Sequence, residues 1–260
     1  MNSVLLAGVA TTGTWLITAL GAATVIFFRN MKARTENFLL GFSAGVMIAA
    51  SFWSLLQPAI EEADQLCRLP ACLVAGIGFG GGAAFLWLCD RVSSRFFEKR
   101  ENTGSISRIF LLVLSITLHN IPEGLAVGVA FGAAGASGNR SDLFAAFSVA
   151  LGIGLQNFPE GAAVSLPLYR EGFSAGRSFF IGQASALVEP IFGLIGAGVV
   201  VHCRFILPYA LAFAAGAMIL VAVHELIPEC KSEPDAHPYR STLGILFGFA
   251  LMMILDVAFG

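Results

Sequence analysis

The chain has 260 residues, of which 57% are hydrophobic and 12% are charged, and its formal net charge is −2. Charged residues make up about a quarter of an ordinary soluble domain. A composition with a mean hydropathy of +0.80 therefore excludes a soluble globular protein and indicates a polytopic membrane protein. No basic cluster with interleaved aromatic residues occurs, which argues against a nucleic-acid partner.

Eight apolar runs are each long enough to cross about 30 Å of hydrocarbon. They cover residues 4–28, 38–59, 71–90, 109–132, 142–168, 178–200, 205–228 and 241–259. The first run has no basic segment before it and is too long for the apolar part of a signal peptide, so we interpret it as an uncleaved span. The connecting loops are short. The sequence therefore predicts an all-α integral membrane protein with one transmembrane domain over residues 1–260.

Lysine and arginine are distributed unequally among the loops. The loops after the second, fourth and sixth spans hold only Arg68, Arg140 and Arg204, which leaves 12 of the 15 basic residues to the other loops. Because basic loops stay in the cytoplasm, both termini are predicted to face outward. Five scattered cysteines predict no disulfide framework, although pairing of Cys67 with Cys72 across a predicted outer loop stays open.

Two neighbouring spans contain near-copies of one polar motif. Residues 119–124 read HNIPEG in the fourth span, and residues 156–161 read QNFPEG in the fifth. A carboxylate at the centre of a membrane span costs about 2.5–3.5 kcal/mol on insertion scales, so its repeated use indicates function. The predicted orientation makes the two spans antiparallel, which places the motifs at similar depth as an inverted repeat. Residues 44–48 and 215–219 repeat more weakly between the second and seventh spans.

The motifs supply carboxylate, imidazole and amide donors, which share neighbouring faces of each helix. With a further carboxylate from the sixth span, the predicted metal ligands are His119, Asn120, Glu123, Gln156, Asn157, Glu160 and Glu189. Each motif proline also lacks an N–H and frees a backbone carbonyl. This set lacks a thiolate and suits Zn²⁺, Fe²⁺, Mn²⁺ or Cd²⁺ better than Cu⁺, while the imidazole argues against Mg²⁺ or Ca²⁺. His224 and Glu225 are predicted to lie lower on the pathway, towards the cytoplasm.

Two other functions compete with metal transport. An intramembrane protease is disfavoured because Ser137 of a G-x-S-G sequence falls in a loop and Pro228 replaces the second histidine of an H-E-x-x-H motif. The chain is therefore predicted not to be an enzyme. A proton- or sodium-coupled cation exchanger that uses the same carboxylates is the closer alternative, and His119 favours a transition metal over Na⁺.

At these residues the chain resembles the ZIP (ZRT/IRT-like) family of divalent-metal transporters, and within it the bacterial GufA-like branch. The resemblance rests on both motifs, on Glu189-Pro190 and on residues 214–229, which contain His224-Glu225. It implies eight helices in a 3+2+3 inverted repeat, a location in the cell (inner) membrane and transport of zinc, and also of iron, cadmium or manganese, into the cytoplasm. It implies no cofactor and is compatible with a homodimer.

The resemblance also implies two adjoining metal sites. The first comprises His119, Glu123, Gln156 and Glu160, and the second adds Asn120, Asn157 and Glu189 while it shares Glu123 and Glu160. Many family members have histidine where Gln156 stands, and close relatives have aspartate where Asn157 stands. Fewer charged ligands here imply a weaker second site.

Overall fold

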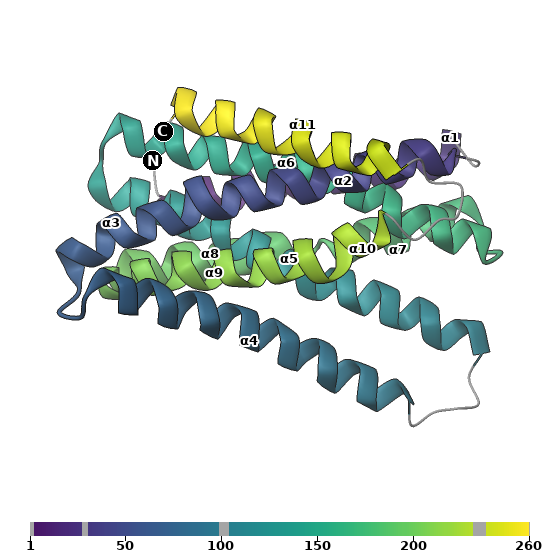
Figure 1. The fold of residues 1–260 in the computed structure, drawn as a ribbon, viewed down its shortest axis with the longest axis horizontal. Helices are drawn as coiled ribbons and strands as arrows, with labels where there is room; N and C mark the ends of the chain where they lie inside the picture. The colour runs from purple at the N-terminus through teal and green to yellow at the C-terminus, as the bar shows by residue number, and fades with distance from the viewer. Residues whose placement is uncertain (1–2, 28–30, 99–103, 231–237, 260) are drawn as a thin grey trace.

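The computed structural model describes residues 3–27, 31–98, 104–230 and 238–259, and every regular element in these ranges is helical. Eight long helical segments run along the long axis of the molecule (Figure 1). The elements in chain order are α1 (Ser3–Phe27), α2 (Ala33–Ala50), η1 (Ser51–Leu56), α3 (Gln57–Leu66), α4 (Ala71–Glu98), α5 (Gly104–Ser137), α6 (Arg140–Arg170), α7 (Ala175–Ser185), α8 (Val188–His202), η2 (Arg204–Ile206), α9 (Leu207–Val221), η3 (Ala222–Leu226), α10 (Ile227–Glu229) and α11 (Pro238–Phe259).

The eight predicted spans correspond to these segments, and seven of them are long and apolar enough to cross a membrane. The exception is α6. Every 18-residue window of this helix contains Gln156 and Asn157, which lower its hydropathy. The helix that carries the second motif is therefore the least apolar of the eight. A helix of this polarity is stable in a membrane only when other helices cover its polar face.

Proline shapes the segments in different ways. Pro122 and Pro159 lie within the continuous helices α5 and α6. Pro190, by contrast, follows a break at Ala186 and Leu187 that divides the predicted sixth span into α7 and α8. Because Pro190 has no N–H to donate, the carbonyl of Ala186 accepts instead from the backbone N–H of Glu189 at 3.0 Å, and α8 starts close to Glu189.

Two segments, η1 and η3, are π-helical and continue directly from α2 and α9. Each is followed by a proline near the start of the next helix, Pro58 in α3 and Pro228 in α10. π-helical turns are rare in proteins overall, and those that occur often lie at functional sites. The sequence did not predict them, since a π-turn has no hydrophobic period of its own.

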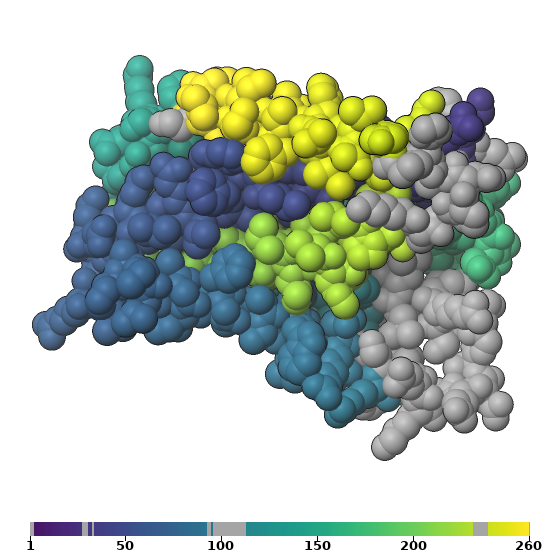
Figure 2. Space-filling model, in the orientation of Figure 1, coloured from purple at the N-terminus to yellow at the C-terminus, as the bar shows by residue number. Residues whose placement is uncertain are grey.

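The long segments pack into two groups. The motif group consists of α1, α5, α6, α7 and α8, in which α1 lies along α6 and α5 lies along α8. The flanking group consists of α2, α3, α4, α9, α10 and α11, in which α2 lies along α11 and α4 lies along α9. Figure 2 shows the face of the flanking group, with α11, α2, α9 and α4 in that order. All seven predicted ligands belong to the motif group.

Glycines set the close spacing within the motif group. A Cβ at Gly124 would overlap the carbonyl of Glu189, and a Cβ at Gly128 would overlap the carbonyl of Gly193. Protein therefore covers the glycine face of α5, since small residues at this spacing let membrane helices approach closely. The Gly76 and Gly80 pair on α4 differs, because no described atom beyond the adjoining backbone of α4 lies within 4 Å of a Cβ at either position.

Both ends of the chain lie at the same end of the bundle (Figure 1). α1 begins there, α11 ends there, and the turn between α3 and α4 lies there too, whereas α4 ends and α5 begins at the opposite end. Of the basic loop residues that fix the predicted orientation, Arg29, Lys99, Arg100 and Lys231 lie outside the described residues. None of the five cysteines, all of which are described, forms a disulfide.

Candidate metal site

The predicted ligands are buried where α5, α6 and α8 meet. None of the seven is more than 6% exposed, and Glu123, Gln156, Asn157 and Glu189 are completely buried. This burial follows from the sequence, because the glycine face of α5 lets the backbone of α8 approach it closely. Carboxylates, amides and an imidazole therefore share one almost completely buried region.

Hydrogen bonds between amides and carboxylates join the three helices. Gln156 Nε2 of α6 donates to Glu123 Oε1 of α5 at 2.6 Å. Asn157 Nδ2, also of α6, donates to both carboxylate oxygens of Glu189 of α8 at 2.9 Å each. Neighbouring amides of the second motif thus contact carboxylates on two other helices. The structure thus joins these four predicted ligands as two hydrogen-bonded pairs.

Three hydroxyl groups that the sequence analysis did not identify also contact the carboxylates. Thr14 Oγ1 and Thr18 Oγ1 of α1 donate to Glu189 at 2.5 and 3.4 Å, and Ser43 Oγ of α2 donates to Glu160 Oε1 at 2.9 Å. Serine and threonine in apolar helices usually bond to their own backbone, so they carry little signal. The spacing of Thr11, Thr14 and Thr18 on one helical face is the pattern that could have revealed the α1 contribution.

Four buried oxygen atoms of the site accept no hydrogen bond from the described residues. They are Asn120 Oδ1, Glu123 Oε2, Gln156 Oε1 and Asn157 Oδ1. A buried acceptor without a partner costs about 1–3 kcal/mol, and here carboxylate and amide oxygens remain unsatisfied on α5 and α6 alike. Oxygen atoms that lack a proton donor are suited to bind a cation. This donor chemistry fits a divalent metal ion.

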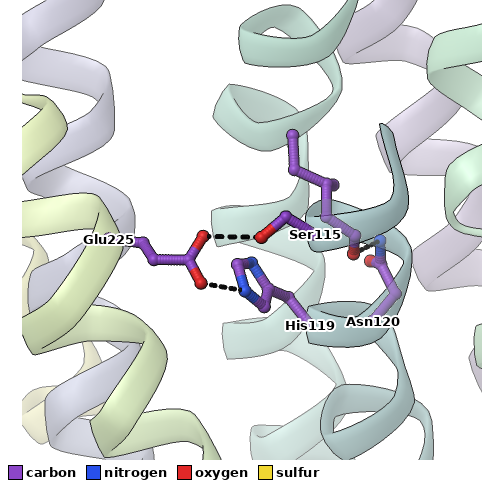
Figure 3. Close-up of polar contacts among 5 residues, drawn as sticks. Ser115, His119, Asn120 and Glu225 are labelled. Atoms are coloured by element: carbon purple, nitrogen blue, oxygen red, sulfur yellow. Dashed lines mark hydrogen bonds and ion pairs between the residues drawn. The ribbon is translucent and has the colours of Figure 1, made fainter. Parts of the chain in front are cut away.

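His119 has a different partner in this conformation. Its Nε2 lies 2.6 Å from Glu225 Oε1, and Ser115 Oγ donates to Glu225 Oε2 at 3.0 Å (Figure 3). Glu225 comes from η3, which continues α9 of the flanking group, whereas His224 beside it is exposed. Of the two predicted pathway residues, the structure brings only Glu225 to the site. Among the described residues, no three His, Cys, Asp or Glu side chains lie close enough together to hold one metal ion.

A cavity of about 510 Å³ lies between the two groups, near the end where α11 ends. Its walls carry four carboxylates, Glu61, Glu62, Asp142 and Asp256, and one guanidinium, Arg204. Ser54 and Ser148 donate to Asp256 Oδ1 at 2.7 and 3.2 Å. The carboxylates outnumber the single guanidinium, and an excess of negative charge raises the local concentration of cations.

Comparison with known proteins agrees with the geometry. A family model described as ZIP Zinc transporter matches residues 101–256. Zinc transporter ZIP11 of Homo sapiens is 37% identical, over 100% of this chain and 98% of the relative. Zinc transporter ZIPB of Bordetella bronchiseptica is 39% identical over 94% of this chain and 78% of the relative. Zinc transporter GufA of Myxococcus xanthus is 34% identical over 98% and 97%. The chain therefore belongs to the ZIP family of zinc transporters, which are multi-pass membrane proteins and not enzymes.

Proposed function

We propose that the chain carries zinc into the cytoplasm through a site between α5, α6 and α8. The observation that carries this proposal is the set of four unsatisfied buried oxygens beside Glu123, Glu160 and Glu189. Glu123, Glu160 and Glu189 have no lysine or arginine partner among the described residues, and buried negative charge of this kind favours the binding of a cation. Fe²⁺, Cd²⁺ and Mn²⁺ are further proposed substrates because they accept the same donors.

The proposed ligands divide between two adjoining positions. His119, Glu123, Gln156 and Glu160 bind one ion, and Asn120, Asn157 and Glu189 extend the site on the α8 side. In the described conformation His119 is held by Glu225, so it joins the first position only when it leaves that partner. In this proposal Glu225 and the metal ion compete for the imidazole of His119. His224, whose side chain is exposed, contributes to the more open part of the pathway.

A 3+2+3 inverted repeat accounts for the packing that is observed. The two π-helical segments begin at Ser51 and Ala222, which are 171 residues apart. Thr18 and Glu189, whose side chains are hydrogen-bonded, have the same separation. A constant separation between matching positions is expected of a repeat. If the first three spans correspond to the last three, the α1–α6 pair corresponds to α8–α5. The α2–α11 pair then corresponds to α9–α4, and all four pairs occur.

Both termini are proposed to face outward, which cysteine labelling tests. Cys72 is exposed at the start of α4, at the end of the bundle where the chain begins and ends. In a variant with the other four cysteines replaced by serine, a membrane-impermeant maleimide should label Cys72 in intact cells. Ser174→Cys, at an exposed position between α6 and α7, should react in a cysteine-free chain only after permeabilisation. Labelling of the opposite pattern contradicts the orientation.

Gln156 is expected to set the preference among metals. Its Oε1 is unsatisfied and its Nε2 donates to Glu123, so Gln156→His replaces an oxygen donor with an imidazole nitrogen. Nitrogen ligands favour zinc over manganese and iron, and we expect a higher ratio of Zn²⁺ to Mn²⁺ uptake. Gln183→His, at a buried glutamine of α7 that bonds to the Phe180 carbonyl, is the matched control. An unchanged ratio in Gln156→His removes this residue from the selectivity of the site.

Uptake into proteoliposomes across a panel of metals tests the function as a whole. Zinc should enter in the absence of Na⁺ and without an imposed pH gradient. Strict dependence on Na⁺ or on a proton gradient, with no selectivity for transition metals, would instead identify a coupled cation exchanger that uses the same carboxylates. A homodimer remains a prediction from the family resemblance, which light scattering in detergent tests.

A further inference from the structure

Ser43 approaches the site from outside the motif group. It lies on α2 between Gly41 and Gly45, where a Cβ would overlap the carbonyls of Ser241 and Ile245 of α11. These contacts fix one face of α2 against the backbone of α11. Because residues two apart on a helix point to nearly opposite sides, Ser43 faces away from α11. The structure places its hydroxyl against α6.

The hydroxyl of Ser43 is aimed at a proposed metal ligand. Its Oγ donates to Glu160 Oε1 at 2.9 Å and also lies 3.3 Å from the Gln156 carbonyl. A hydroxyl has one proton, and a carboxylate is the stronger acceptor, so the bond to Glu160 takes precedence. Ser43 is completely buried. Within the described residues, it is the one donor from the flanking group to Glu123, Glu160 or Glu189.

We propose that Ser43 is a positioning residue of the transport site, which holds Glu160 in the orientation that binds the metal. This inference rests on the proposed function, in which Glu160 is a ligand. By anchoring Oε1, Ser43 restricts a flexible side chain and leaves Oε2 available to the ion. Hydrogen-bond partners of metal ligands act in this way, and their loss typically lowers metal affinity or activity about 10- to 100-fold.

A structural role is the alternative that the test has to exclude. A buried serine can simply join two membrane helices by bonding to a backbone carbonyl, and Gln156 offers such a carbonyl. In that case Ser43→Ala lowers the stability and the amount of active protein, which reduces Vmax. A positioning role raises KM instead, because it weakens the binding of zinc. A loss of active protein alone leaves KM unchanged, so KM distinguishes the two roles.

The experiment measures zinc uptake by proteoliposomes as a function of zinc concentration. We expect Ser43→Ala to raise KM about tenfold with Vmax unchanged, Ser43→Thr to retain the wild-type KM, and Ser43→Cys, a weak donor, to lie between them. Ser51→Ala is the matched control, since Ser51 is buried on the same helical run but donates to the Met47 carbonyl. Its KM should equal that of the wild type.

Three outcomes overturn the inference: a wild-type KM in Ser43→Ala, an equal shift in Ser51→Ala, or no recovery in Ser43→Thr. If Ser43→Ala does not fold, the comparison of Ser43→Cys with Ser43→Thr decides in the same way. Glu160→Ala is measured in parallel. Loss of uptake in Glu160→Ala with a wild-type KM in Ser43→Ala refutes only the role of Ser43, whereas normal uptake in Glu160→Ala refutes the proposed function itself.

Discussion

Zinc uptake is expected to disappear when Glu123 or Glu160 is replaced by alanine. Both carboxylates are buried at the junction of α5 and α6 and have no basic partner among the described residues. Loss of a partner that only supports a ligand costs about 10- to 100-fold, so loss of the ligand itself should exceed that range. The measurement is uptake of radioactive zinc into proteoliposomes that contain equal amounts of folded protein.

A carboxylate outside the site provides the control for this experiment. Glu171 is exposed at the end of α6, and Glu171→Ala should transport zinc at the wild-type rate. Glu123→Gln separates charge from shape, because an amide keeps the volume and can still accept the hydrogen bond from Gln156. Full uptake by Glu123→Ala or by Glu160→Ala shows that the site lies elsewhere.

Gly161→Val is expected to have the largest effect on stability. A Cβ at Gly161 would overlap the carbonyl of Thr18 in α1, so the helices must separate to accept it. Overpacking costs about 1–3 kcal/mol when neighbouring side chains adjust, and a backbone carbonyl inside a helix has little freedom to do so. We expect a marked fall in the thermal unfolding temperature in detergent, and loss of the contact between Glu189 and Thr18.

Gly80→Val is the matched substitution for this test. Gly80 lies on α4, and no described atom beyond the adjoining backbone of α4 lies within 4 Å of a Cβ there. The unfolding temperature of Gly80→Val should therefore match that of the wild type. A similar fall in both variants would attribute the effect to the loss of glycine from a membrane helix. The difference between the variants therefore measures the close approach of α6 to α1.

The helices and the motif residues could be predicted because they depend on neighbours in the sequence. The length of each apolar run fixes its span, and the spacing of Asn157 and Glu160 fixes their shared side of α6. Ser43 and Thr14 could not be assigned, since their contacts depend on how α2 and α1 rotate against other helices. The same holds for His119. Its bond to Glu225 depends on the π-helical turn η3, and nothing in residues 222–226 indicates that turn.

The hydropathy of α6 illustrates a further limit of prediction from sequence. The apolar run at 142–168 indicated a span, yet α6, which contains Gln156 and Asn157, is the one long helix of the described residues that is not apolar enough to count as a span. These two amides are covered by α5 and α8, through their bonds to Glu123 and Glu189. Contacts with other helices thus satisfy the two amides of α6, whereas a hydropathy average counts them only as polar residues.

The amide bonds to the carboxylates also bear on how the transporter behaves between one zinc ion and the next. In the proposed site, three buried carboxylates repel one another whenever no cation neutralises them. Gln156 and Asn157 donate N–H groups to Glu123 and Glu189 and leave their own oxygens without a partner. If zinc binds there as proposed, these hydrogen bonds offset part of the repulsion and keep both carboxylates in place after the ion leaves.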